Sequence, residues 1–120
     1  MKKWEKSPKE LIELFNKILP DKGVIEKRQM FGYPSSFINR NMFMGLFGDQ
    51  LFIRLSESDR DEFLKLDEAK LFEPMAGRPM KEYVMIPASL LKDTTTLNEW
   101  IEKSFVYTAS LPPRSSKKRK

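Results

Sequence analysis

The sequence predicts an α+β fold in which an antiparallel sheet carries helices packed mainly on one face. Apolar residues repeat at helical spacing in two long segments, residues 11–19 and 97–109. Between them lie short apolar runs separated by turn residues, which is typical of antiparallel strands joined by hairpins. Folds of this class and size usually place their helices on one face of the sheet. The 120 residues fit one domain with a single core.

The first helix has clear start and stop signals. Residues 7–10 (Ser-Pro-Lys-Glu) supply an N-cap, a proline at the first helical position and a capping-box glutamate. The helical repeat runs to Leu19, and Pro20 with Gly23 ends it. A strand over residues 24–30 is expected next. Its polar residues fall on both faces, which indicates an edge strand or a lead-in.

Residues 34–55 are predicted to form an antiparallel meander. The first turn is expected at residues 39–41, and Gly48-Asp49 between two apolar runs predicts a two-residue hairpin with the glycine at positive φ. Ser56 is expected to cap a short helix, with Asp59 at its third position. Phe63 and Leu66 should form the inner face of that helix.

The last third of the chain is expected to contain one further strand and one long helix. A Pro- and Gly-rich loop over residues 73–79 leads to a strand near 80–86 and a single helical turn at 87–92. The final helix should begin at Thr95 or Thr96 and end before Pro112-Pro113. We expect one domain over residues 1–113 and a disordered basic tail over residues 114–120.

Two predicted strands do not alternate between apolar and polar residues. Residues 42–47 and 83–86 are apolar throughout, so we expect both faces of these strands to be covered. Only two substantial helices are available, and a second face needs another cover. A second copy of the chain or a protein partner would supply it; the alternative is that loops such as residues 67–79 fold over that face. The contact residues expected in the first case are Phe43, Phe47 and Phe52.

Two absences from the composition exclude many catalytic classes. The chain has no cysteine and no histidine, which excludes disulfides, thiol catalysis, thiolate zinc sites and imidazole general bases. No phosphate-binding glycine loop and no nucleophile elbow occurs. The acidic residues at 57–62 lack the spacing of a calcium loop and suit the first turn of a helix. We therefore expect a protein that is not an enzyme, with no cofactor, no metal and no small-molecule substrate.

The net charge of +5 lies in the last seven residues. Removing their five cations from the 22 basic residues leaves 17, which equals the 17 acidic residues, so residues 1–113 are neutral overall. Such a tail attracts phosphate non-specifically, although short basic ends often only aid solubility. Arg78 and Lys81, near Tyr83, could add contacts to single-stranded nucleic acid, against the alternative of ordinary surface charge. The tail cations are Arg114, Lys117, Lys118, Arg119 and Lys120.

No segment of the sequence indicates a membrane or secreted protein. The charged start, residues 1–6, is not followed by the apolar run of a signal peptide. The longest apolar stretch, residues 42–47, is far shorter than the ~20 residues that a spanning helix needs. We expect a cytoplasmic protein.

Short motifs in a fixed order give the sequence a family resemblance. They are KRQMFG at 27–32, NMF at 41–43, LFIRL at 51–55, FEPM at 72–75, GRPM at 77–80 and ASLPP at 109–113. Over roughly residues 10–113 the chain resembles the TfoX/Sxy N-terminal domain family, as a stand-alone single-domain member. The resemblance implies a secretion-chaperone-like α+β fold. It also implies a role like that of relatives that regulate competence genes, which are thought to assist a cyclic-AMP-responsive activator at promoters.

The expected function follows from the exclusions and the resemblance together. The first hypothesis is a cytoplasmic, non-enzymatic domain that acts by protein–protein contact, as a homodimer or with another protein, and regulates transcription. The alternative is a nucleic-acid-binding accessory protein that uses the basic tail.

Overall fold

A computed structural model describes residues 9–19, 23–30, 33–66, 68–75 and 77–112. It confirms the predicted class, because the fold is α+β with a six-stranded, wholly antiparallel sheet of order β1-β2-β3-β4-β6-β5. The elements along the chain are α1 (Lys9–Ile18), β1 (Ile25–Met30), β2 (Tyr33–Ile38), β3 (Asn41–Phe47), β4 (Gln50–Arg54), α2 (Glu57–Phe63), β5 (Lys70–Met75), β6 (Arg78–Met85), α3 (Ala88–Leu91) and α4 (Thr94–Ser110).

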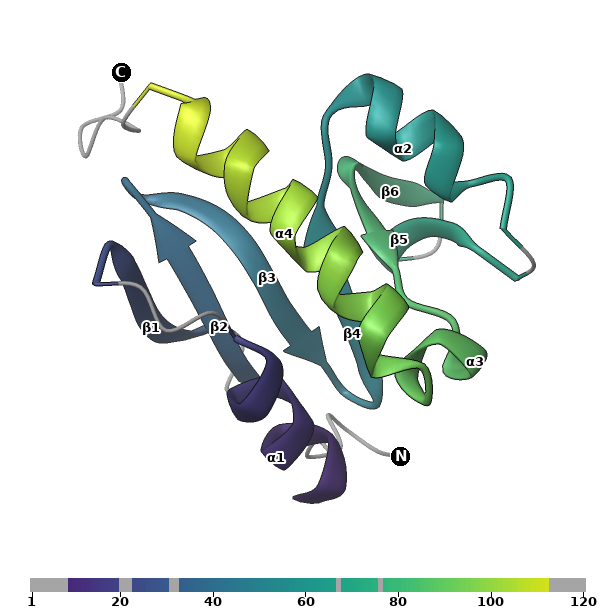
Figure 1. Cartoon of the computed structure of the whole chain (residues 1–120), viewed down its shortest axis with the longest axis horizontal. Helices are drawn as coiled ribbons and strands as arrows, with labels where there is room; N and C mark the ends of the chain where they lie inside the picture. The colour runs from purple at the N-terminus through teal and green to yellow at the C-terminus, as the bar shows by residue number, and fades with distance from the viewer. Residues whose placement is uncertain (1–8, 20–22, 31–32, 67, 76, 113–120) are drawn as a thin grey trace.

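The long helices cover one face of the sheet, as predicted. Figure 1 shows α4 running obliquely in front of β3 and β4, with α1 on the same side of the sheet. The short helix α2 packs against β6, and α3 packs against α4. We call the face beneath α1 and α4 the helix face, and the other the second face.

The main core lies between the helices and the helix face. Leu11 and Phe15 of α1 and Leu97 and Ile101 of α4 are buried there. They meet alternate side chains of the central strands, because successive residues of a strand point to opposite faces. The strand residues in this cluster include Met44, Leu46, Leu51, Ile53 and Val84.

Local signals position the turns and helix starts. Gly48 has a φ of +62° and Phe47 pairs with Gln50, which confirms the predicted two-residue hairpin. Ser56 caps α2 as predicted, and its Oγ accepts a hydrogen bond from the Asp59 amide at 3.3 Å. The helix α4 begins at Thr94, before the predicted start, because the Asp93 carboxylate accepts from the Thr96 amide at 3.2 Å and so acts as the cap.

The predicted loop at residues 73–79 was wrong. Residues 70–75 form β5, which pairs with β6 through a tight turn whose Gly77 has a φ of +80°. Proline is compatible with β5, because β5 is an outermost strand of the described sheet and Pro74 lies where its register with β6 shifts, between Phe72 and Met75. Leu66 was also misplaced: it lies beyond the end of α2 and its side chain is 39% exposed.

Some predictions fall outside the described part of the chain. They are the cap of the first helix at Ser7-Pro8 and the basic tail, residues 114–120. Among the described helices, none has the length and apolar character to cross a membrane.

Candidate functional site

A β-bulge in β3 decides which side chains reach each face of the sheet. Ser36 of β2 pairs with Met44, but Phe37 pairs with Met42, so Phe43 is an extra residue on β3. The bulge turns the Phe43 ring toward the helices, where it packs edge-to-face on Phe105 at 5.9 Å. The expectation that Phe43 faces away from the helices was therefore wrong. A bulge depends on strand pairing, and the run of apolar residues gives no sign of it.

The second face carries a cluster of aromatic rings. Phe52 of β4 stacks on Phe72 of β5 with ring centres 4.1 Å apart, and it meets Tyr83 of β6 edge-to-face at 5.8 Å. Phe72 also contacts Phe47 of β3 at 5.7 Å, and Phe47 contacts Tyr33 of β2 at 5.4 Å. These five rings, which we call the aromatic row, link five of the six strands. Tyr33, at the end of the row, also belongs to the main core.

Gly45 makes room for the aromatic row. A Cβ atom at this position would lie 2.9 Å from Cζ of Phe52 and 3.2 Å from Cβ of Ser35. The Phe52 ring therefore lies over the β3 backbone, where a side chain would otherwise stand. Glycine at position 45 is needed for this close approach.

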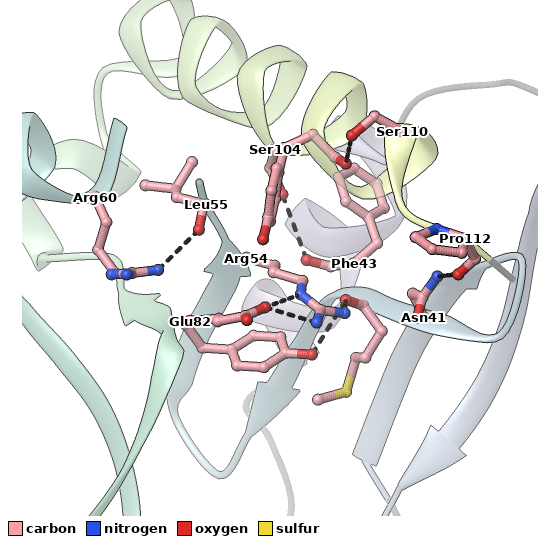
Figure 2. Close-up of polar contacts among 12 residues, drawn as sticks. Asn41, Phe43, Arg54, Leu55, Arg60, Glu82, Ser104, Ser110 and Pro112 are labelled. Atoms are coloured by element: carbon pink, nitrogen blue, oxygen red, sulfur yellow. Dashed lines mark hydrogen bonds and ion pairs between the residues drawn. The ribbon is translucent and has the colours of Figure 1, made fainter. Parts of the chain in front are cut away.

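An ion pair stands at one end of the aromatic row. Nε of Arg54 donates to Oε1 of Glu82 at 2.7 Å, and Nη2 lies 2.6 Å from the same oxygen (Figure 2). The Arg54 guanidinium also lies 5.4 Å from the centre of the Tyr83 ring, within range of a cation–π contact. The pair ties β4 to β6.

Side chains from both layers donate to three consecutive carbonyls at the bulge. The Met42 carbonyl accepts from the Tyr83 hydroxyl at 3.2 Å and from Nη1 of Arg54 at 3.4 Å. The Phe43 carbonyl accepts from Ser104 of α4 at 3.5 Å (Figure 2), and the Met44 carbonyl accepts from Ser36 at 3.1 Å. Because a bulge disrupts the ladder locally, these donors help to satisfy its buried polar backbone.

The three predicted interface residues differ in what they present to solvent. Phe43 and Phe52 are fully buried within the single chain, one on each face. Phe47 is half-buried. Of the three, Phe47 alone keeps accessible side-chain surface, and contact with a partner stays a prediction for this position.

The described part of the structure does not include the side chains of the predicted nucleic-acid contacts. Arg78 and Lys81 belong to β6, and their side chains lie outside the described part of the structure. The tail residues Arg114, Lys117, Lys118, Arg119 and Lys120 also lie outside it. Nucleic-acid binding by these residues stays a prediction.

Among the described residues, open grooves also lie elsewhere on the surface. One, of about 560 Å³, lies between the β3–β4 turn, the start of β5 and α3, and is lined by Asp49, Glu68, Lys70 and Leu91 among others. Another, of about 370 Å³, runs between α2 and α4 beside Val106, which is 59% exposed. Within the described ranges, no group of three or more acidic side chains is placed to hold a metal ion.

Comparison with protein-family models identifies the family of this chain. The sequence model of the TfoX N-terminal domain matches residues 15–106, which run from the last turn of α1 through most of α4. A search of curated proteins finds no match.

Proposed function

This chain belongs to the TfoX N-terminal domain family, and on that premise we propose that it is a regulator that acts by contact with another protein, without catalysis. The family suggests a role of the regulator type, related to competence. We propose in addition that the contact is made through the second face and that the regulated step is transcription.

We assign the contact to the second face because side chains at its rim are partly exposed. Phe37, Phe47 and Met80 pack against the buried aromatic cluster and remain half-buried. The Arg28 guanidinium lies over the Phe37 ring, and the Arg54 guanidinium lies over the Tyr83 ring of the aromatic row. Aromatic residues, methionine and arginine are enriched in protein interfaces, so this rim suits a partner with apolar and acidic side chains.

Complementation in the source cell tests the proposal. We expect loss of the gene to lower competence-gene transcripts and the wild-type chain to restore them. The Phe47→Glu variant should fail to restore them, because it places a charge in the contact. Val106→Glu is the matched control, since it charges an exposed apolar residue on α4, away from the sheet. Transcripts unchanged by gene loss would refute the regulatory role.

A separate outcome would refute the assignment of the contact to the second face. Restoration by Phe47→Glu as complete as by Val106→Glu would exclude the second face as the contact. Circular dichroism must show that the variant folds, and Phe37→Glu provides a second probe of the same rim.

A second candidate function rests on the basic tail. Its five cations on an otherwise neutral chain suit a nucleic-acid-binding accessory protein. Fluorescence anisotropy should compare the wild-type chain with a variant whose five tail cations are glutamine. If all five tail cations contact phosphates of duplex DNA, the logarithm of the binding constant should fall with the logarithm of the salt concentration with a slope no steeper than about −4.5. Loss of all binding in the variant would show non-specific attraction by the tail, whereas sequence-selective binding that persists would place recognition in the folded domain.

A further inference from the structure

The two outermost strands of the described sheet differ in how regular they are. The strand β1 pairs with β2 residue by residue from Ile25 to Met30, with no register shift. The strand β5 pairs with β6 through two register shifts and contains Pro74. An outermost strand presents one row of backbone donors and acceptors on its open side. Within the described part of the sheet, β1 is the outermost strand that presents this row without a register shift.

We propose that β1 is a self-association site, at which two copies of this chain pair edge to edge in antiparallel orientation with Lys27 opposite Lys27 of the second copy. A two-fold axis perpendicular to the sheet relates antiparallel strands of identical sequence, so the side chains of two opposed residues point to the same face of the joined sheet. The two sheets then continue into one, with both helix layers on the same side. The proposal goes beyond the regulatory function and does not depend on it.

Charge complementarity selects this register. Glu26 and Arg28 lie on the same face of β1, two residues apart, and form an exposed ion pair at 3.0 Å. With the axis at Lys27, Glu26 of each copy stands opposite Arg28 of the other, which gives two cross-strand pairs of opposite charge. An axis at residue 26 would oppose two glutamates, and an axis at residue 28 would oppose two arginines. The register at Lys27 is the one that pairs opposite charges twice.

Two further features support pairing at this edge. Val24, just before β1, is 59% exposed, which only Val106 equals among the large apolar residues of the described chain, and the pairing would bring it opposite position 30 of the second copy. The Arg28 guanidinium lies 5.5 Å from the centre of the Phe37 ring of β2, which keeps it on the face of β1 that it shares with Glu26. The cost is one pair of like charges at Lys27. Charges on an edge also oppose pairing with unrelated strands, so the same residues favour the self-complementary partner.

A single introduced cysteine tests the register, because the natural chain has none. Directly opposed residues have Cβ atoms about 4.5–5.5 Å apart, close to the separation that a disulfide needs. Lys27→Cys should therefore form a disulfide-linked dimer on mild oxidation. Gln29→Cys is the matched control on the same strand, since the two copies of position 29 would be roughly 13 Å apart along the strands. Lys65→Cys, highly exposed near α2, reports random collision.

We expect Lys27→Cys to cross-link roughly tenfold faster or more than either control, because the pairing raises the effective concentration of the two thiols. Equal rates for all three variants, or a faster rate for Gln29→Cys, would overturn the proposal.

A charge exchange gives a second, independent measurement on the uncross-linked protein. Sedimentation equilibrium should show reversible dimers of the wild-type chain at low salt. Glu26→Arg turns both attractive pairs into repulsive ones and should raise the dimer dissociation constant at least about tenfold. The double variant Glu26→Arg/Arg28→Glu should restore it. A wild-type chain that stays monomeric at every concentration, or a double variant as weak as the single one, would overturn the pairing.

Discussion

The central strands of this sheet are buried on both faces, but different parts of the chain cover the two faces. On the helix face, α1 and α4 supply the cover, and the strand side chains beneath them are mostly aliphatic. On the second face, the sheet covers itself with large rings from five strands, closed by the ion pair of Arg54 and Glu82. Strands without alternation therefore do not by themselves require a second layer of helices. Aromatic rings that pack on one another bury a face when a glycine lets them approach the backbone.

The largest expected effects come from removing one buried ring on each face. Phe43 packs beneath α4, and Phe52 lies in the aromatic row. We expect Phe43→Ala and Phe52→Ala each to lower the free energy of unfolding by about 3–5 kcal/mol, because each removes a fully buried aromatic side chain. Urea denaturation followed by circular dichroism measures both.

These two variants test whether the second face is a core, as the helix face is. If Phe52→Ala cost as little as Val106→Ala, which should stay within about 0.5 kcal/mol because Val106 is exposed, the second face would not be a true core. Near-equal losses for Phe43→Ala and Phe52→Ala would establish two cores of similar weight.

A smaller effect is expected from adding one methyl group beneath the aromatic row. Gly45→Ala would place a carbon 2.9 Å from Cζ of Phe52 and 3.3 Å from the Pro34 carbonyl oxygen, so the ring must move. We expect a loss of about 1–3 kcal/mol in the free energy of unfolding. Gly23→Ala is the control, because nothing lies within 4 Å of its new carbon.

A double-mutant cycle tests whether contact with the Phe52 ring causes the loss of stability in Gly45→Ala. In Gly45→Ala/Phe52→Ala the ring that the methyl group meets is gone, so the two losses should sum to more than the measured total by about 0.5–3 kcal/mol. Strict additivity would show that Gly45 serves the backbone and not the ring.

The sequence predicted those features that depend on neighbouring residues. The hairpin at Gly48 and the cap at Ser56 follow from a few adjacent side chains, and both are confirmed. The apolar character of residues 42–47 correctly indicated cover on both faces. Features set by pairing between distant strands were missed. Pro74 and Gly77 suit a loop and a tight hairpin equally well, so β5 was not foreseen, although it brings Phe72 to the second face.

The candidate site was partly predictable for the same reason. Phe47 and Phe52 were identified as residues of the second face, and they do lie in the aromatic row. The segment 67–79 was one of the covers considered, and it contributes as a strand of the sheet instead of a loop laid over it. Phe43 was misassigned because the bulge opposite Ser36 and Phe37 changes the direction of its side chain.

The smallest effects are expected from removing one hydroxyl group on each face. Both hydroxyls donate to neighbouring carbonyls at the bulge. Tyr83 donates to the Met42 carbonyl at 3.2 Å, and Ser104 donates to the Phe43 carbonyl at 3.5 Å. We expect Tyr83→Phe to cost about 0.5–1.5 kcal/mol in the free energy of unfolding, since a net hydrogen bond is lost while the ring stays. Ser104→Ala should cost less, because the longer bond lies at the limit of hydrogen-bond geometry.

Arg54 makes the outcome of Tyr83→Phe informative. Its Nη1 atom also donates to the Met42 carbonyl, so that acceptor keeps a partner when the tyrosine hydroxyl is removed. If the loss instead exceeded about 3 kcal/mol, the carbonyl would behave as an unsatisfied buried group. Arg54 would then serve only the ion pair with Glu82. The double variant Arg54→Met/Tyr83→Phe tests whether the two donors substitute for each other. If they do, Tyr83→Phe alone lowers the free energy of unfolding within the expected range, and the double variant lowers it by more than the sum of the two single losses.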